Sequence, residues 1–159
     1  MPRFSRLYWR ILRRRASPKI PVTPVASPRP PRVLLVDDAP SLCGVMRRHL
    51  EARRYEVLCA TTAHEALEVV SREAEPPDVL VIDVGLPDMS GRELVHRLAQ
   101  QIGPTPVLYV SGANATPELT ASLRARANFL GKPFQLEELR LRVDAIRAES
   151  GGGTIHEAS

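Results

Sequence analysis

Short aliphatic runs alternate with amphipathic stretches along most of this 159-residue chain, from about residue 32 to residue 148. The runs have the length and composition of buried strands, and the stretches between them place apolar residues at helical spacing. The expected strands are Val33–Val36, Glu56–Ala60, Val79–Asp83, Pro106–Val110 and Phe129–Leu130. The expected helices are Ser41–Arg54, Ala63–Glu75, Gly91–Gln101, one beginning at Thr116–Pro117, and Leu136–Ala148. This alternation predicts an α/β fold with helices on both faces of a parallel sheet.

The apolar stripes of the helices predict which side chains pack against the sheet. Prolines and glycines delimit these helices: Pro76 and Pro77 end the second helix, and the glycines from Gly151 end the last one. The expected inward positions are Leu42, Val45, Met46, His49, Leu50, Ala66, Leu67, Val70, Leu94, Val95, Leu98, Leu136, Leu139, Val143 and Ile146.

Polar side chains stand where the expected strands end. Asp37 and Asp38 follow the first strand, Asp83 ends the third, Ser111 follows the fourth and Lys132 follows the fifth. Right-handed crossovers bring the carboxyl ends of parallel strands to one edge of the sheet, so these side chains should converge. Two carboxylates 4 Å apart repel by about 4 kcal/mol at an effective dielectric of 20, so the cluster should hold a cation or share protons. Oxygen ligands favour Mg²⁺.

An aspartate beside a divalent cation, a hydroxyl group and an ammonium group is suited to accept a phosphoryl group. Asp83 would attack phosphorus, Mg²⁺ and Lys132 would neutralise the phosphoryl oxygens, and Ser111 would hydrogen-bond one of them.

Four segments of the chain resemble the response-regulator receiver domains of two-component signalling. They are Val33–Pro40, Val81–Gly91, Leu108–Gly112 and Phe129–Phe134, in the order and spacing of that family. The resemblance covers about residues 32–149. It implies a flavodoxin-like (βα)5 doubly wound sheet with strand order 2-1-3-4-5.

The resemblance also implies the roles of the site residues. Asp83 would be the phosphoacceptor, and Lys132, joined to Pro133 by a cis bond, would pair with the phosphoryl group. Ser111 and Phe129 would form a switch, working through steric packing because Phe129 has no hydroxyl group. The implied Mg²⁺ ligands are Asp38 and Asp83 directly, Asp37 through water, and the backbone carbonyl of Gly85.

The resemblance implies a cytoplasmic signalling domain that catalyses only its own phosphorylation and dephosphorylation. Its phosphodonor would be a sensor histidine kinase or a histidine phosphotransfer protein. A downstream protein would bind the surface formed by the fourth helix, the fifth strand and the fifth helix. We expect no output domain to follow, because about ten residues remain after the last helix.

The net charge of +4 is unevenly distributed. Nine of the 22 Lys and Arg residues lie in residues 1–32, which contain no acid, so the remainder is net acidic and predicts no nucleic-acid binding. We expect residues 1–15 to form a basic amphipathic or disordered leader, and the proline-rich residues 16–31 to form an extended linker. By the resemblance, the receiver domain would span residues 32–149, and residues 150–159 would form a flexible tail. Cys43 and Cys59 are expected as free thiols.

Three alternatives remain at the level of sequence. The strand-end aspartate also suits a Mg²⁺-dependent phosphohydrolase of the haloacid-dehalogenase type, although that class needs Asp-x-Asp on its nucleophile strand and Val33–Pro40 has Asp-Asp. The leader, through residues 3–15, would give weak contact with an anionic membrane and so a tethered receiver. The chain would alternatively be a piece of a hybrid kinase.

Overall fold

Five parallel strands form one sheet in a computed structural model that describes residues 29–112, 116, 117, 121 and 128–151. The strand order is β2-β1-β3-β4-β5. This order confirms the predicted flavodoxin-like arrangement and places β1 beside β3. The strands are β1 (Arg32–Val36), β2 (Glu56–Ala60), β3 (Val79–Asp83), β4 (Val107–Ser111) and β5 (Phe129–Gly131).

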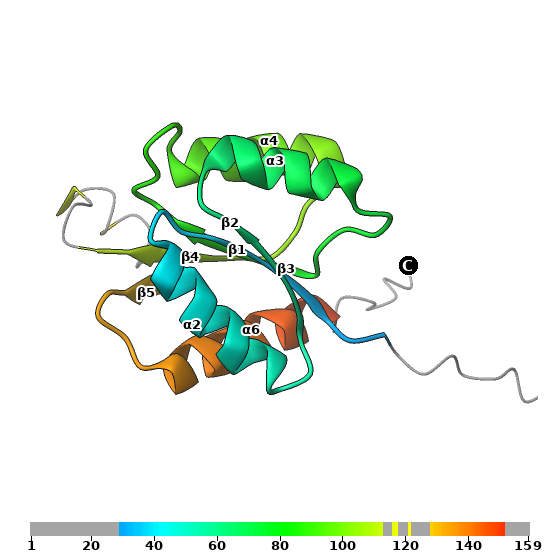
Figure 1. Cartoon of the computed structure of the whole chain (residues 1–159), viewed down its shortest axis with the longest axis vertical. Helices are drawn as coiled ribbons and strands as arrows, with labels where there is room; N and C mark the ends of the chain where they lie inside the picture. Colours follow the sequence, from blue (N-terminus) through cyan, green and yellow to red (C-terminus); the bar gives the residue numbers. More distant parts are fainter. Residues whose placement is uncertain (1–28, 113–115, 118–120, 122–127, 152–159) are drawn as a thin grey trace, which may run out of the picture.

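Helices cover both faces of the sheet. They are α2 (Pro40–Glu51), α3 (Ala63–Arg72), α4 (Gly91–Ile102) and α6 (Leu136–Gly151). Figure 1 shows α3 and α4 on one face, with α2 and α6 on the other. Within the described ranges, no helix is long and apolar enough to cross a bilayer. The predicted leader, most of the linker, most of the tail and most of the helix expected from Thr116 lie outside the described residues.

The strand register brings the carboxyl ends of the strands together. Val36 pairs with Ile82, Asp83 pairs with Val110, and Ser111 pairs with Gly131. The residues that end these strands or directly follow them therefore stand side by side at one edge.

Apolar side chains fill the space on both faces of the sheet. Every residue of β1 and β3 is buried, as the continuous aliphatic runs predicted. One layer packs between the sheet and helices α2 and α6, and the other between the sheet and helices α3 and α4. Fully buried members include Leu35, Met46, Leu108 and Leu139 in the first layer and Leu34, Leu80, Leu94 and Leu98 in the second.

Two helices are shorter than predicted. α2 ends at Glu51, and Arg54 adopts φ 66°, a left-handed conformation that a continuing helix cannot contain. α3 ends at Arg72 because Glu73 is extended. The helical stripe of α2 was also partly wrong: Val45 is 38% exposed, whereas Cys43 faces the core at 4%.

Arg32 is buried at the amino end of β1, which the sequence analysis did not anticipate. Its guanidinium group pairs with the carboxylates of Glu56, at 2.8 Å, and Glu73, and its pKa is raised, chiefly by the hydrogen bond to Glu73. Its backbone N–H donates to Asp78 Oδ2 at 2.7 Å, and Arg29 pairs with the same carboxylate at 3.0 Å. This network fixes the start of β1 opposite the edge that carries the aspartates.

Replacing Tyr55 with phenylalanine should destabilise the fold modestly. The hydroxyl group of Tyr55 donates to Asp144 of α6, and its loss should lower the free energy of unfolding by about 1 kcal/mol because Asp144 keeps Arg140 as a partner. Burial, aided by this bond, raises the pKa of Tyr55 from 10.0 to about 12. The unfolded tyrosine therefore ionises first, and this contribution, complete below pH 10, is lost as pH rises through about 12.

Urea unfolding at neutral pH and across that alkaline range tests this prediction. The wild type should lose stability more steeply than Tyr55→Phe. Equal slopes would contradict the proposed role of the hydroxyl group.

Candidate functional site

Asp37 lies directly after β1, and hydrogen bonds fix both its backbone and its carboxylate. Its N–H donates to the carbonyl of Ala60 at 3.2 Å, which continues the pairing of β1 with β2. Its Oδ1 accepts the N–H of Ala39 at 2.9 Å. The side chain is only 2% exposed, so a buried carboxylate is held in one orientation toward the end of β3.

Asp83 is the last residue of β3, and its carboxylate is also held at both oxygens. Oδ1 accepts the N–H of Gly85 at 2.8 Å, and Oδ2 accepts the ammonium group of Lys132 at 3.0 Å. The next residue, Val84, donates its N–H to Val110 of β4 at 2.9 Å. The chain is therefore anchored immediately beyond the carboxylate, which lies at the opening between the strand ends.

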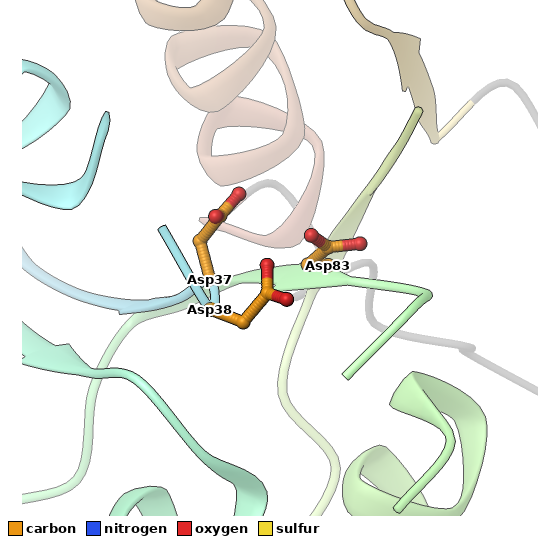
Figure 2. A group of neighbouring side chains, drawn as sticks. All are labelled: Asp37, Asp38 and Asp83. Carbon is orange, nitrogen blue, oxygen red and sulfur yellow. The ribbon is translucent and has the colours of Figure 1, made fainter. Parts of the chain in front are cut away.

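The three aspartates form one cluster. One carboxylate oxygen from each of Asp37, Asp38 and Asp83 lies within 4.8 Å of the others. Asp38 is exposed, whereas the other two are buried. Figure 2 shows Asp37 and Asp38 rising from the end of β1 beside Asp83 on β3. An oxygen-only donor set with one open side fits a hard divalent cation that keeps some water ligands.

Lys132 is the cation that the structure places in this cluster. Its N–H donates to Ser111 O at 2.7 Å, which holds the loop after β5 against β4. Its ammonium group contacts Asp37 Oδ2 at 2.5 Å and Asp83 Oδ2 at 3.0 Å. Burial alone would lower the pKa of Lys132, but the bonds to the two carboxylates outweigh it and raise that pKa. The predicted cis bond between Lys132 and Pro133 is confirmed.

The two predicted switch residues lie near the site on β4 and β5. Ser111 is buried, and its hydroxyl group donates to the carbonyl of Gly112 at 3.2 Å. Phe129 is half-buried, and its carbonyl accepts from Arg142 of α6 at 3.3 Å. Their positions agree with the sequence analysis, whereas their roles as a switch stay predictions.

Asp88 braces the loop after Asp83, a role that the sequence analysis did not assign. Its two carboxylate oxygens accept the N–H groups of Ala63 and His64 at the start of α3, both at 3.0 Å. These two bonds lower the pKa of Asp88. Nothing in the sequence pairs Asp88 with residues 24 and 25 positions earlier in the chain, so this bond could be found only from the fold.

Gly91 permits the close approach of α4 to β3, and alanine there should destabilise the protein. A Cβ atom at this position would lie 2.6 Å from the carbonyl oxygen of Asp83 and 3.1 Å from Cα of Val84. Because both are backbone atoms, either the start of α4 or the loop that follows Asp83 must shift. We expect the free energy of unfolding to fall by about 1–3 kcal/mol.

Gly44 supplies the matched control for this substitution. A Cβ atom on Gly44, inside α2, would meet nothing within 4 Å, so Gly44→Ala should stabilise the helix by up to about 1 kcal/mol. Chemical denaturation of both variants checks the pair of predictions. If the two substitutions changed the free energy of unfolding equally, the close approach of α4 to β3 would not require glycine at position 91.

The chain matches a family model described as the response regulator receiver domain over residues 33–144. It is 38% identical over 116 residues to the response regulator MprA of Mycobacterium leprae, covering 72% of this chain and 50% of that protein. It is 34% identical over 131 residues to the probable transcriptional regulatory protein TcrX of Mycobacterium tuberculosis, covering 82% of this chain and 55% of that protein. The chain thus spans about half the length of these curated relatives.

Solved structures of similar fold agree with the match to the family model. The signal receiver domain of a putative Luxo repressor protein from Vibrio parahaemolyticus superposes with a TM-score of 0.67 at 26% identity, covering 81% of this chain and 98% of that one. The chemotaxis protein CheY4 of Vibrio cholerae gives a TM-score of 0.62 at 30% identity, covering 73% and 98%.

Proposed function

Because the chain belongs to the response regulator receiver domain family, we propose that Asp83 accepts a phosphoryl group in a Mg²⁺-dependent reaction. The observation that carries this proposal is the convergence of Asp37, Asp38, Asp83 and Lys132 at one edge of the sheet. Family membership favours this function over the phosphohydrolase alternative. The protein would act as a signalling domain that catalyses only its own phosphorylation and dephosphorylation.

The carboxylate of Asp83 is the nucleophile in this proposal. One of its oxygens forms a bond to phosphorus while the bond from phosphorus to the nitrogen of the partner's phosphohistidine breaks. The N–H of Gly85 and the ammonium group of Lys132 already orient the carboxylate, so little reorganisation is needed at the moment of attack. Lys132 is positioned to neutralise charge on the transferred group.

Mg²⁺ fits the acidic cluster because three carboxylates gather there and the ammonium group of Lys132 contacts two of them, Asp37 and Asp83. Asp38 and Asp83 would bind the ion directly, Asp37 through water, and Gly85 through its carbonyl oxygen. When bound, the ion would neutralise the phosphoryl oxygens and reduce repulsion between the donor and the carboxylates. Asp37 would also keep Lys132 in place through their 2.5 Å contact.

Phosphorylation would be transmitted through Ser111 and Phe129. The Ser111 hydroxyl group, now bonded to Gly112 O, would turn to a phosphoryl oxygen, and the ring of Phe129 would move into the space released. This proposal is supported by the pairing of β4 with β5 at Tyr109 and Phe129 and at Ser111 and Gly131. The surface of the predicted fourth helix, β5 and α6 would then change shape for a downstream protein.

An open apolar groove beside Lys132 supports docking of the phosphodonor, a histidine kinase or a histidine phosphotransfer protein. The groove encloses about 520 Å³ and lies between α2 and the loop before α6. Its lining comprises Leu42, Val45, Gly112, Lys132, Pro133, Phe134 and Leu136. Such a donor would place this domain in the cytoplasm. The relative TcrX carries the name transcriptional regulatory protein, but we propose no nucleic-acid binding for the residues described here.

Incubation with a small phosphodonor tests the proposal. The full chain should gain the mass of one phosphoryl group when it is mixed with acetyl phosphate or phosphoramidate and Mg²⁺. The gain should disappear when EDTA removes the ion and should return when Mg²⁺ is restored. Labelling to the same extent and at the same rate in EDTA would contradict the metal dependence.

A further inference from the structure

The loop between β3 and α4 carries Gly85, whose carbonyl oxygen is one of the proposed Mg²⁺ ligands. The backbone of Val84 is anchored on both sides: its N–H donates to the carbonyl oxygen of Val110 at 2.9 Å, and its own carbonyl oxygen accepts the N–H of the first residue of α4 at 3.3 Å. Leu86 is buried in the apolar layer that it shares with α3 and α4. Gly85 is exposed between these two anchors, and the two residues after Leu86 are also exposed. The position of Gly85 therefore depends on how the outer part of the loop is held.

The carboxylate of Asp88 holds this outer part against the start of α3. Its Oδ1 accepts the N–H of Ala63 and its Oδ2 the N–H of His64, both at 3.0 Å, and Nδ1 of His64 lies 2.6 Å from Oδ2. The N-cap of the helix, Thr62, accepts the N–H of Glu65 at 3.1 Å. The two side chains thus share the first three backbone donors of α3, which have no partners within the helix. The side chain of Asp88 is 23% exposed, so most of it is shielded from competing water.

The start of α3 is in turn tied to the loop that follows β1. The carbonyl oxygen of Ala60, the last residue of β2, accepts the N–H of Asp37 at 3.2 Å. Between Ala60 and the helix, Thr61 is fixed by Glu65, whose carboxylate accepts its N–H at 2.6 Å and its hydroxyl group at 2.9 Å. This short segment therefore connects the two loops that carry the proposed ligands, and Asp88 closes the connection on the side of β3.

We propose that Asp88 is a positioning residue for the cation site, an inference that rests on the function proposed above. Both of its carboxylate oxygens are bound to α3, so it acts through the loop and not as a ligand. With this tether, the Gly85 carbonyl and the carboxylates at the strand ends are held in place before the ion binds. Without it, the ion must order the loop as it binds, and the lost conformational freedom weakens binding. Side chains that hold metal ligands in place typically contribute about 10- to 100-fold to affinity.

Titration of the full chain with Mg²⁺ in an isothermal calorimeter tests the role of Asp88. Asp88→Ala should raise the dissociation constant about tenfold, at the lower end of that range because Val84 and Leu86 stay anchored. Asp88→Asn removes the same charge but keeps one oxygen that can accept an N–H of α3, so it should recover part of the affinity. Equal losses in the two variants would assign the effect to charge and overturn the proposal, as would wild-type affinity in Asp88→Ala.

Thr62→Ala is the matched control, because it removes the other cap of the same helix start and leaves the tether in place. It should lower the thermal midpoint of unfolding, as Asp88→Ala does, yet bind Mg²⁺ with wild-type affinity. If Thr62→Ala lost as much affinity as Asp88→Ala, the stability of the helix start alone would explain the result and the proposal would fail.

A measurement in EDTA separates this inference from the proposed function. The N–H of Gly85 donates to Asp83 Oδ1 at 2.8 Å, so its amide should exchange with solvent faster in Asp88→Ala than in the wild type, and its resonance should shift. A Gly85 amide that is unchanged in Asp88→Ala would overturn the role of Asp88 alone. A wild type that binds no Mg²⁺ would overturn the proposed function and, with it, the cation site that Asp88 positions.

Discussion

Replacing Asp83 with asparagine should abolish phosphorylation while leaving the fold intact. The amide retains an oxygen that can accept the N–H of Gly85, so the local hydrogen bonding is largely preserved. It lacks the ionised oxygen that must form the new bond to phosphorus. Intact mass after incubation with acetyl phosphate and Mg²⁺ should show full addition in the wild type and none in the variant.

Asp78 provides the control for this substitution. It precedes β3 at the opposite end of the same strand, where it pairs with Arg29 and with the N–H of Arg32. Asp78→Asn should lose some stability but should still be phosphorylated. If Asp83→Asn were labelled as fast as Asp78→Asn, the acceptor would lie elsewhere.

Replacing Lys132 with methionine should slow phosphorylation by about 100- to 1000-fold, the cost of removing one preorganised charge from a developing transition state. Methionine keeps an apolar stem of similar length but ends the contacts with Asp37 and Asp83. It also leaves the buried carboxylate of Asp37 without its cation. Time courses of mass gain at saturating Mg²⁺ measure the rate when the metal site is filled.

Arg97 supplies a charge-matched control. It is exposed on α4 and forms an ion pair at 2.8 Å with Glu93, one helical turn earlier. Arg97→Met should be phosphorylated at the wild-type rate. A Lys132→Met variant within a factor of about two of that rate would show that the ammonium group contributes little, far below the effect expected of such a donor. Thermal unfolding of both variants separates slow chemistry from loss of the fold.

The sequence pattern predicted the elements that position the site because each depends on local information. The bounds of β2 and β3 were predicted to the residue. An aliphatic run such as Val79–Asp83 identifies a strand buried on both faces wherever it occurs. The convergence of polar side chains at the strand ends could be predicted once the strands were inferred to be parallel. The exact strand order came from the family resemblance.

The features that the sequence did not predict depend on partners distant along the chain. Arg32 was expected only as the first residue of the domain, where it follows the linker, yet it is buried because carboxylates 24 and 41 residues away reach it. Asp88 caps α3 only because the fold brings that helix beside its loop. Val45 shares the helical spacing of the α2 stripe but lines the groove beside Lys132 and is exposed.

Locating the phosphate on the chain tests the central claim most directly. Borohydride reduces an aspartyl phosphate to homoserine, so the phosphorylated protein can be trapped, digested and sequenced by mass spectrometry. We predict homoserine at position 83 in the Mg²⁺-treated wild type and aspartate at positions 37 and 38. Homoserine at either of those positions, or a phosphate that survives borohydride on another residue, would contradict the account.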